Sequence, residues 1–209
     1  MSFEAVLSER GVVILDGGLA TALEERGHVL DTRLWSAAIL RIDPEAIRDV
    51  HSAYLEAGAD CITTASYQAS FPGLAASGVE GVEAEEVFRL SSELALEARD
   101  SFTARRGPSH VTPNQLPGRR PRRADRGGSE SRPLVAASVG PYGAYLADGS
   151  EYDGRYGISS EDLDRFHRRR FELLAGTGVD LMACETLPSA AEAEVLLAIL
   201  DDQPADVRA

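Results

Sequence analysis

The stretch PEAIRDVHSAYLEAGADCITTASYQAS, residues 44–70, carries the clearest helix and strand signals of the chain and decides its fold class. Asp43 can cap a helix that begins at Pro44, and apolar residues then recur at helical spacing as far as Gly58. A short apolar run, Cys61–Ala65, follows at once. A helix that leads directly into a buried strand is typical of an α/β protein.

Three further apolar runs resemble the run at 61–65. Each is short and is closed by polar or glycine residues, as expected for a buried strand of a parallel sheet. Together the runs predict strands at Val12–Leu15, Cys61–Ala65, Leu134–Val139 and Leu181–Cys184. Helical patterns separate the runs, and because βα crossovers are right-handed we expect the strands to lie parallel and in chain order.

Two of the later helical patterns begin with capping-box sequences, Ser159 with Asp162 and Ser189 with Glu192. Four βα units amount to half of a TIM (β/α)8 barrel, which typically takes about 250 residues. The chain of 209 residues is therefore predicted to be an α/β protein that covers the first four units of such a barrel. A small open sheet of the flavodoxin type is the alternative.

The segment 105–133 interrupts this alternation. It combines prolines and glycines with arginines and holds almost no apolar residues. Such a segment cannot bury enough surface to offset its ordering entropy, so we predict a disordered insertion. Its RRPRR core, residues 119–123, could bind an anionic partner, but a solvated linker is the preferred interpretation.

Composition excludes several classes of function. The net charge of -13 repels phosphate backbones and anionic lipids, so neither nucleic acid nor a membrane is an expected partner. All 21 basic residues are arginine, which excludes a lysine Schiff base. No apolar run is long enough to span a membrane and residues 1–11 do not look like a signal peptide, so a cytoplasmic location is predicted.

Polar residues at the carboxyl ends of the predicted strands are the candidate site, since ligands bind there in parallel α/β folds. Asp16 closes the first run and Glu185 closes the fourth. Two carboxylates at one mouth, with the backbone N–H groups of Gly17 and Gly18, would suit a zwitterionic amino acid. As alternatives, Asp16 caps the helix from Leu19 and Glu185 pairs with an arginine.

Strand alternation divides the neighbouring residues between the two faces of the sheet. If Thr64 faces the barrel axis, Ile62 does too, while Cys61 and Thr63 face the helices. A Glu185 that points to the mouth turns Cys184 outward.

Other residues with chemical potential have more ordinary interpretations. The aromatic residues nearest the strand ends could hold a cationic sulfonium or could simply pack; they are Trp35, Tyr67, Tyr142 and Tyr145. His51 lies within the helical pattern beside Val50, where a hydrogen-bonded structural histidine is expected. The cysteines lack the spacing of a metal or redox motif, so reduced core thiols are expected.

Five segments resemble the homocysteine S-methyltransferase family. They are ILDGGLATALEERG (14–27), LWSAAIL (34–40), PEAIRDVHSAYLEAGADCITTASYQAS (44–70), VAASVGPYGAYLADGSEYDGRYG (135–157) and DLMACETLPSAAEAE (180–194). The resemblance implies a zinc-dependent (β/α)8 barrel that transfers a methyl group from a sulfonium donor to homocysteine, giving methionine. GPYGAYLADGSEY looks most like the branch that uses S-methylmethionine or S-adenosylmethionine.

The resemblance also implies roles for individual residues. Asp16 and Glu185 would hold the amino group of homocysteine. The residues that would line the amino-acid pocket are Gly17, Gly18 and Thr64, and those on the donor side are Trp35 and Tyr142. The resemblance implies no catalytic residue in this chain.

The family's zinc ligands, by the same resemblance, are three cysteines on the sixth and eighth strands, two of them in a GGCC motif that this chain lacks. Cys61 and Cys184 match none of the three, so no metal ligand is expected. Residues 1–209 would then be a C-terminally truncated homocysteine-binding barrel domain, inactive in this form. The alternatives are a noncatalytic half-barrel remnant or interaction module and, more remotely, a hydrolase that uses Asp16 and Glu185 as acid and base.

Overall fold

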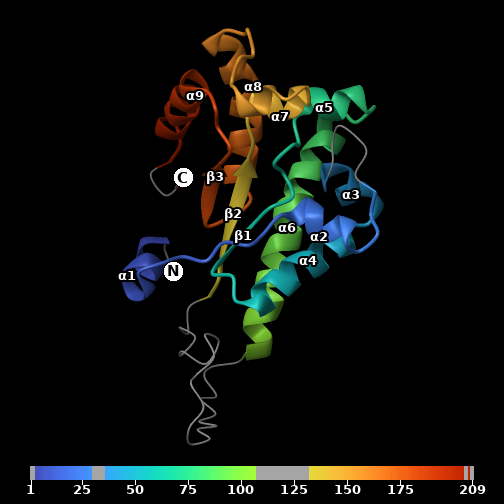
Figure 1. Cartoon of the computed structure of the whole chain (residues 1–209), viewed down its shortest axis with the longest axis vertical. Coiled ribbons are helices and arrows are strands. Elements are labelled where there is room, and N and C mark those ends of the chain that lie inside the picture. The colour runs from blue at the N-terminus through green and yellow to red at the C-terminus, as the bar shows by residue number, and fades with distance from the viewer. Residues whose placement is uncertain (1–2, 30–35, 107–131, 205–206, 208–209) are drawn as a thin grey trace, which may run out of the picture.

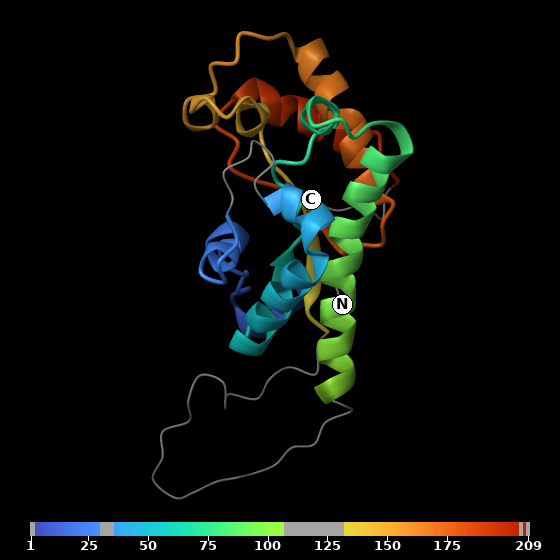
Figure 2. The same cartoon turned by 90° about the vertical axis from the view of Figure 1, so that its right-hand side faces the viewer.

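Helices and parallel strands alternate along the chain in the computed structural model, which describes residues 3–29, 36–106, 132–204 and 207. The elements are α1 (Phe3–Arg10), α2 (Leu19–Glu24), α3 (Ser36–Ile42), α4 (Pro44–Ala57), β1 (Cys61–Thr63), α5 (Phe71–Ala76), α6 (Gly81–Arg106), β2 (Leu134–Val139), α7 (Tyr142–Leu146), η2 (Ser150–Tyr152), α8 (Ser160–Ala175), β3 (Leu181–Cys184) and α9 (Ala190–Asp201). In Figure 1 the strands run through the centre, with α5 and α7 at the upper end. Figure 2 shows α6 running along much of the molecule's length, with α4 beside its lower part.

The three strands form one parallel sheet in the order β1-β2-β3. Cys61 is paired with Leu134, and Ala136 with Leu181. The predicted direction and order of these strands are confirmed. Two predicted ranges match β2 and β3 residue for residue, while β1 ends at Thr63 instead of Ala65.

At Val12–Leu15 the structure has an edge segment instead of the predicted strand. It runs parallel to β1 but makes only one bridge, between Leu15 and Cys61. The pairing ends there because the N–H of Thr63 bonds to the side chain of Asp16 at 2.8 Å instead of to a backbone carbonyl. Ile14 is 40% and Leu15 57% exposed, as expected of an edge segment with a partner on one side only. The described residues thus hold three strands and an edge segment rather than four strands.

Capping residues explain the helix boundaries. The Asp43 carboxylate accepts from the N–H of Ala46 at 3.2 Å, and Gly58 ends α4 with a φ of 105°, which favours glycine. Ser159 and Ser189 cap α8 and α9 as predicted. The helix starts that were predicted at these three positions are confirmed.

The structure places the first residues of the predicted insertion at 105–133 in a helix. Arg105 and Arg106 form the last turn of α6. Beyond them, residues 107–131 lie outside the described residues. None of the described helices is long and apolar enough to cross a membrane.

The sheet has a helix-covered face and a second face. Ile62 packs on the helix-covered face with Leu55 of α4 and Phe102 of α6. Cys61 packs on the other face with Leu134. The expectation that Ile62 lies on the barrel-facing side and Cys61 among the helices is therefore wrong, since β1 has the opposite parity.

The prediction that His51 is hydrogen-bonded is wrong. The side chain is fully buried in α4, and neither ring nitrogen has a hydrogen-bond partner in the described part of the chain. Burial lowers the pKa of His51 to about 4. The helix therefore carries a neutral imidazole with two unsatisfied polar atoms, which is destabilising.

Replacing His51 with leucine is expected to raise the free energy of unfolding by about 1–3 kcal/mol at pH 7, because the unsatisfied ring atoms are removed. The native pKa of about 4 lies below the ordinary 6.5, so stability from this group is complete above pH 6.5 and is lost as the pH falls toward 4. The advantage of His51→Leu should therefore grow over that range. Urea unfolding checks this, with the partly exposed His28→Leu as control; a less stable His51→Leu would contradict it.

Candidate functional site

Asp16 stands at the end of the edge segment, beside the carboxyl end of β1. Its N–H bonds to the carbonyl of Cys61 at 3.0 Å. Its carboxylate accepts from the N–H of Thr63 at 2.8 Å and from the Thr63 hydroxyl at 3.2 Å. Burial raises the pKa of Asp16 to about 6, against the effect of these bonds and with a smaller contribution from the charge of Glu185.

Glu185 follows β3 directly. Its N–H bonds to the carbonyl of Val139 at 3.2 Å, and its carboxylate accepts from the hydroxyl of Ser138 in β2. The strands thus bring Asp16, Thr63, Ser138 and Glu185 to one edge of the sheet, here called the rim. Each carboxylate of this pair is held by a hydroxyl from the neighbouring strand, and both are only half-buried. Two anionic groups in this arrangement suit a cationic ligand group.

The two alternatives for the carboxylates do not match the structure. The residue that caps α2 is Gly18, and no side chain accepts at that position. In the described ranges Glu185 forms no ion pair with an arginine. Both carboxylates therefore remain available at the rim.

The glycine pair passes close to α4. A Cβ on Gly17 would lie 2.8 Å from the hydroxyl oxygen of Tyr54, so only glycine fits without a shift. The Tyr54 hydroxyl in turn donates to the carbonyl of Gly18 at 3.1 Å. Both glycines are exposed next to Asp16.

Thr64 lies behind the rim instead of lining it. Its hydroxyl oxygen accepts from the N–H of Ser138 at 3.0 Å and lies 2.6 Å from the Ser66 hydroxyl, which donates to the Ser138 carbonyl at 2.7 Å. Thr64 is 3% exposed. The residue that contacts Asp16 is its neighbour Thr63, which sequence reasoning assigned to the opposite face.

Thr63→Val is expected to raise the pKa of Asp16 above its present value of about 6, because valine cannot donate the hydroxyl hydrogen bond that stabilises the ionised carboxylate. An NMR titration of the Asp16 carboxyl carbon measures the change. Thr64→Val is the matched control, because its hydroxyl has other partners. A control that shifts Asp16 as much as Thr63→Val does would refute the assignment of the two faces.

The predicted donor-side aromatics are only partly described. Tyr142 opens α7, and its half-buried ring lies 4.9 Å from Phe166, 5.5 Å from Tyr145 and 5.6 Å from Tyr156, measured between ring centroids. Trp35 lies outside the described residues. The structure therefore places Tyr142 in an aromatic cluster above the end of β2 and says nothing of Trp35.

The cysteines do not fit a metal site. Cys61 and Cys184 pack on opposite faces of the sheet. Burial raises the pKa of the Cys61 thiol to about 12 and that of the Cys184 thiol to about 11, which disfavours the thiolates that metals bind. Among the described residues no three His, Cys, Asp or Glu side chains come together as a possible metal site.

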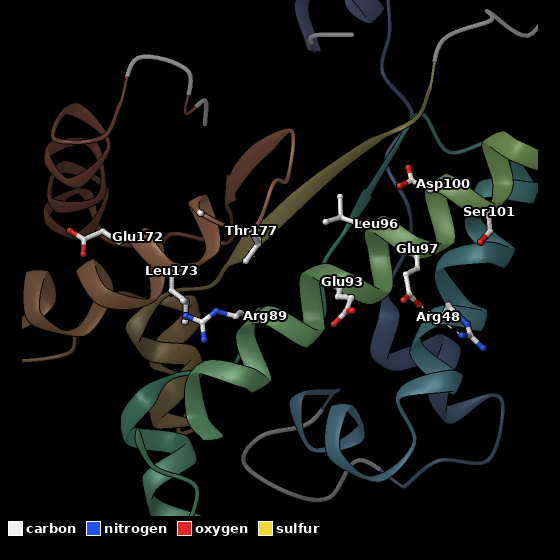
Figure 3. Close-up of a pocket in the computed structure, with 11 residues that line it drawn as sticks. Arg48, Arg89, Glu93, Leu96, Glu97, Asp100, Ser101, Glu172, Leu173 and Thr177 are labelled. Atoms are coloured by element: carbon white, nitrogen blue, oxygen red, sulfur yellow. Dashed lines mark ion pairs between the residues drawn. The ribbon is translucent and has the colours of Figure 1, made fainter. Parts of the chain in front are cut away.

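A cavity of about 890 Å³ lies away from the rim, on the outer side of the helices. Its lining comes from α4, α6, α8 and the turn that follows α8 (Figure 3). Arg48 and Glu97 face each other there at 3.9 Å. Because no strand end contributes to it, this cavity is separate from the candidate site.

Comparison with known proteins decides the family. The family model described as Homocysteine S-methyltransferase matches residues 13–208. The chain belongs to the homocysteine S-methyltransferase family. The match includes Asp16, Thr63 and Glu185, and the resemblance inferred from the sequence is confirmed.

Relatives in this family are similar over nearly the whole chain. Homocysteine S-methyltransferase YbgG of Bacillus subtilis is 45% identical over 199 residues, which is 95% of this chain and 58% of that protein. Homocysteine S-methyltransferase of Escherichia coli is 44% identical over 200 residues, 96% of this chain and 58% of that protein. The chain therefore spans less than three fifths of the length of these homocysteine S-methyltransferases.

Solved structures of the family agree. The metallated form of the homocysteine methyltransferase MmuM from Escherichia coli matches with a TM-score of 0.80 at 44% identity, over 94% of this chain and 61% of that chain. Its oxidized form matches with a TM-score of 0.82. The chain thus has the fold of the corresponding part of a homocysteine S-methyltransferase.

Proposed function

We propose that the chain binds homocysteine through Asp16 and Glu185 and serves methyl transfer from a sulfonium donor to the homocysteine sulfur, which gives methionine. The observation that supports this most is the carboxylate pair at the rim, held by Thr63 and Ser138 in a chain of this family. Homocysteine and a sulfonium donor, S-methylmethionine or S-adenosylmethionine, are the proposed partners.

The carboxylate pair offers a site for the ammonium group of the amino acid. Ammonium–carboxylate hydrogen bonds are charge-assisted and are about twice as strong as neutral ones. With a pKa of about 6, Asp16 is ionised at neutral pH and can accept such a bond. Gly17 and Gly18 are proposed to line the pocket, with Thr64 supporting it from behind.

We further infer that the sheet is part of a TIM (β/α)8 barrel. Support comes from the parallel strands in chain order, the helices α4, α6, α8 and α9 on one face and the placement of candidate residues at the carboxyl ends. Leu15 and Cys61 lie at one border of this sheet and β3 at the other.

The metal of the proposed reaction is zinc, as the sequence resemblance implies. A bound zinc ion would hold the homocysteine sulfur as a thiolate at neutral pH. Because Cys61 and Cys184 do not fit such a site, the residues of this chain are proposed to bind and orient the amino-acid end only. We accordingly expect no methionine from these 209 residues alone. Trp35 and Tyr142 stay proposals for the donor side, and a cytoplasmic location stays a prediction.

Calorimetric titration of the purified chain with L-homocysteine at pH 7.5 tests the proposal. Saturable binding with one site per chain is the expected result, and S-methylmethionine is titrated separately. If neither compound binds, the alternative of a noncatalytic interaction module is favoured. The exposed apolar side chains of Val12, Ile14 and Leu15 would then be its first candidate contact surface.

A further inference from the structure

Three ionisable side chains are buried together beneath the rim, apart from the carboxylate pair. Arg170 and His167 come from α8 and Glu192 comes from α9, and each is at most 1% exposed. Buried charges are costly unless they are paired and hydrogen-bonded. We call these three residues the Arg170 cluster.

The hydrogen bonds of the Arg170 cluster determine which nitrogen of His167 carries the proton. Arg170 can only donate, so its Nη2 donates to Nδ1 of His167 at 2.8 Å. Nε2 of His167 must then carry the ring proton, and it donates to Oε1 of Glu192 at 2.8 Å. A neutral imidazole therefore joins a buried cation to a buried anion.

The surroundings favour these charge states. Burial, with the charge of Arg170, lowers the pKa of His167 to about 4. Burial lowers the pKa of Arg170 to about 10, which still leaves a cation at neutral pH. Against the effect of burial, bonds from His167 and from the N–H of Tyr142 hold the pKa of Glu192 below its usual value.

Arg170 reaches the loops that follow two neighbouring strands. Its Nη1 donates to the carbonyl of Ala69 at 3.1 Å, and its Nη2 donates to the carbonyl of Gly140. The two loops touch there, since the N–H of Gly140 bonds to the Tyr67 carbonyl at 3.3 Å and a Cβ on Gly140 would lie 2.5 Å from that oxygen. One guanidinium thus ties together the loops after β1 and β2.

Glu192 holds the start of α7. Its Oε1 accepts from the N–H of Tyr142, the first residue of that helix. The ring of Tyr142 lies against Phe166, and the guanidinium of Arg170 lies 4.6 Å from the centroid of the same Phe166 ring. Both the backbone and the ring of Tyr142 are therefore positioned by the cluster.

We propose that Arg170, His167 and Glu192 are positioning residues that set the loops after β1 and β2 and, through Tyr142, the methyl-donor side of the site. Only the donor assignment rests on the proposed function. The placement of the loops stands on the hydrogen bonds alone.

Amide hydrogen exchange on the full chain tests the placement of the loops. Arg170→Lys keeps the charge but not the fork that reaches two carbonyls, so exchange at the Gly140 amide should rise about tenfold. Glu192→Gln replaces the charged acceptor of the Tyr142 N–H with a neutral one, and because the bond is then weaker, exchange at the Tyr142 amide should rise as well. The matched controls on α8 are Arg168→Lys at a half-buried position and Glu172→Gln at an exposed one. Both should leave the two amides unchanged, and amides within β2 should stay protected in all four variants.

Two exchange results would overturn the proposal. One is unchanged protection at Gly140 and Tyr142 in the cluster variants, and the other is equal loss of protection throughout β2, which indicates a general structural role. If Glu192→Gln does not fold, Arg170→Lys carries the test because it retains the buried positive charge.

Ligand titration separates this proposal from the proposed function. Arg170→Lys should weaken S-methylmethionine binding about tenfold while homocysteine binding stays within about twofold. If amide exchange rises in the loops but the affinity for S-methylmethionine is unchanged, the donor-side role is refuted. If the parent chain binds neither compound, the proposed function has failed, and the exchange result alone decides whether the cluster positions the loops.

Discussion

Replacing Arg170 with methionine is expected to lower the free energy of unfolding by about 3–5 kcal/mol, because Glu192 is then left as a buried charge without its cation. Arg170 is 1% exposed, and its guanidinium bonds to two carbonyls and to His167. Small domains are stable by only about 5–15 kcal/mol, so this one change removes much of the total. Urea unfolding followed by circular dichroism measures it.

Two further variants show whether charge pairing is the cause. The double variant Arg170→Met with Glu192→Leu should recover part of the loss, since replacing a whole buried ion pair by apolar groups is often nearly neutral. Arg168→Met removes a half-buried arginine that pairs with Asp164 at 2.6 Å and with Asp202 at 2.8 Å, and it should cost less than Arg170→Met because these two carboxylates remain in contact with water. Equal losses for Arg168→Met and Arg170→Met would contradict the account.

Asp16→Asn is expected to weaken homocysteine binding about 10- to 100-fold, which corresponds to roughly 1.5–3 kcal/mol for a hydrogen bond to a charged group. Asparagine keeps the shape of the side chain, and its oxygen can still accept from the N–H of Thr63. Its NH2 group would then face the ligand ammonium, where a carboxylate oxygen lies now. Calorimetric titration at pH 7.5 measures the change in affinity.

The control for this prediction is Asp164→Asn on the outer surface of α8, which should leave homocysteine binding unchanged. Glu185→Gln should weaken binding in the same direction as Asp16→Asn, because both carboxylates belong to one rim. If Asp16→Asn binds homocysteine as tightly as the parent chain does, Asp16 does not hold the ammonium group.

Local patterns in the sequence predict the helix starts well. Asp43, Ser159 and Ser189 cap the helices that follow them, since a cap depends only on residues within one turn. The strands β2 and β3 are equally readable because both are short, apolar and closed by polar or glycine residues. The positions of Asp16 and Glu185 follow from these strand ends.

The remaining features depend on contacts between distant residues. The ladder at Leu15 is short because the side chain of Asp16 takes the N–H of Thr63, and an apolar run cannot show this. Two adjacent threonines leave the parity of β1 undetermined, so Thr63 was assigned to the wrong face. Only the packed structure decides between such registers.

Glu192 is the clearest residue that sequence reasoning missed. The sequence predicts that Glu192 completes a capping box with Ser189, and the cap by the Ser189 side chain is confirmed. Its carboxylate turns inward to His167 and Tyr142 instead of back to the cap. An arginine and a histidine three positions apart on α8 were the available signal, but a helix surface holds many such pairs.

The most direct test of the central claim compares L-homocysteine with 4-mercaptobutanoate, which lacks only the amino group, by calorimetric titration of the same chain. The account predicts saturable binding of homocysteine and affinity for the analogue lower by about tenfold or more, since the carboxylates of Asp16 and Glu185 would lose their cationic partner. Equal affinity for the two compounds would contradict the proposal that this carboxylate pair recognises the amino group of homocysteine.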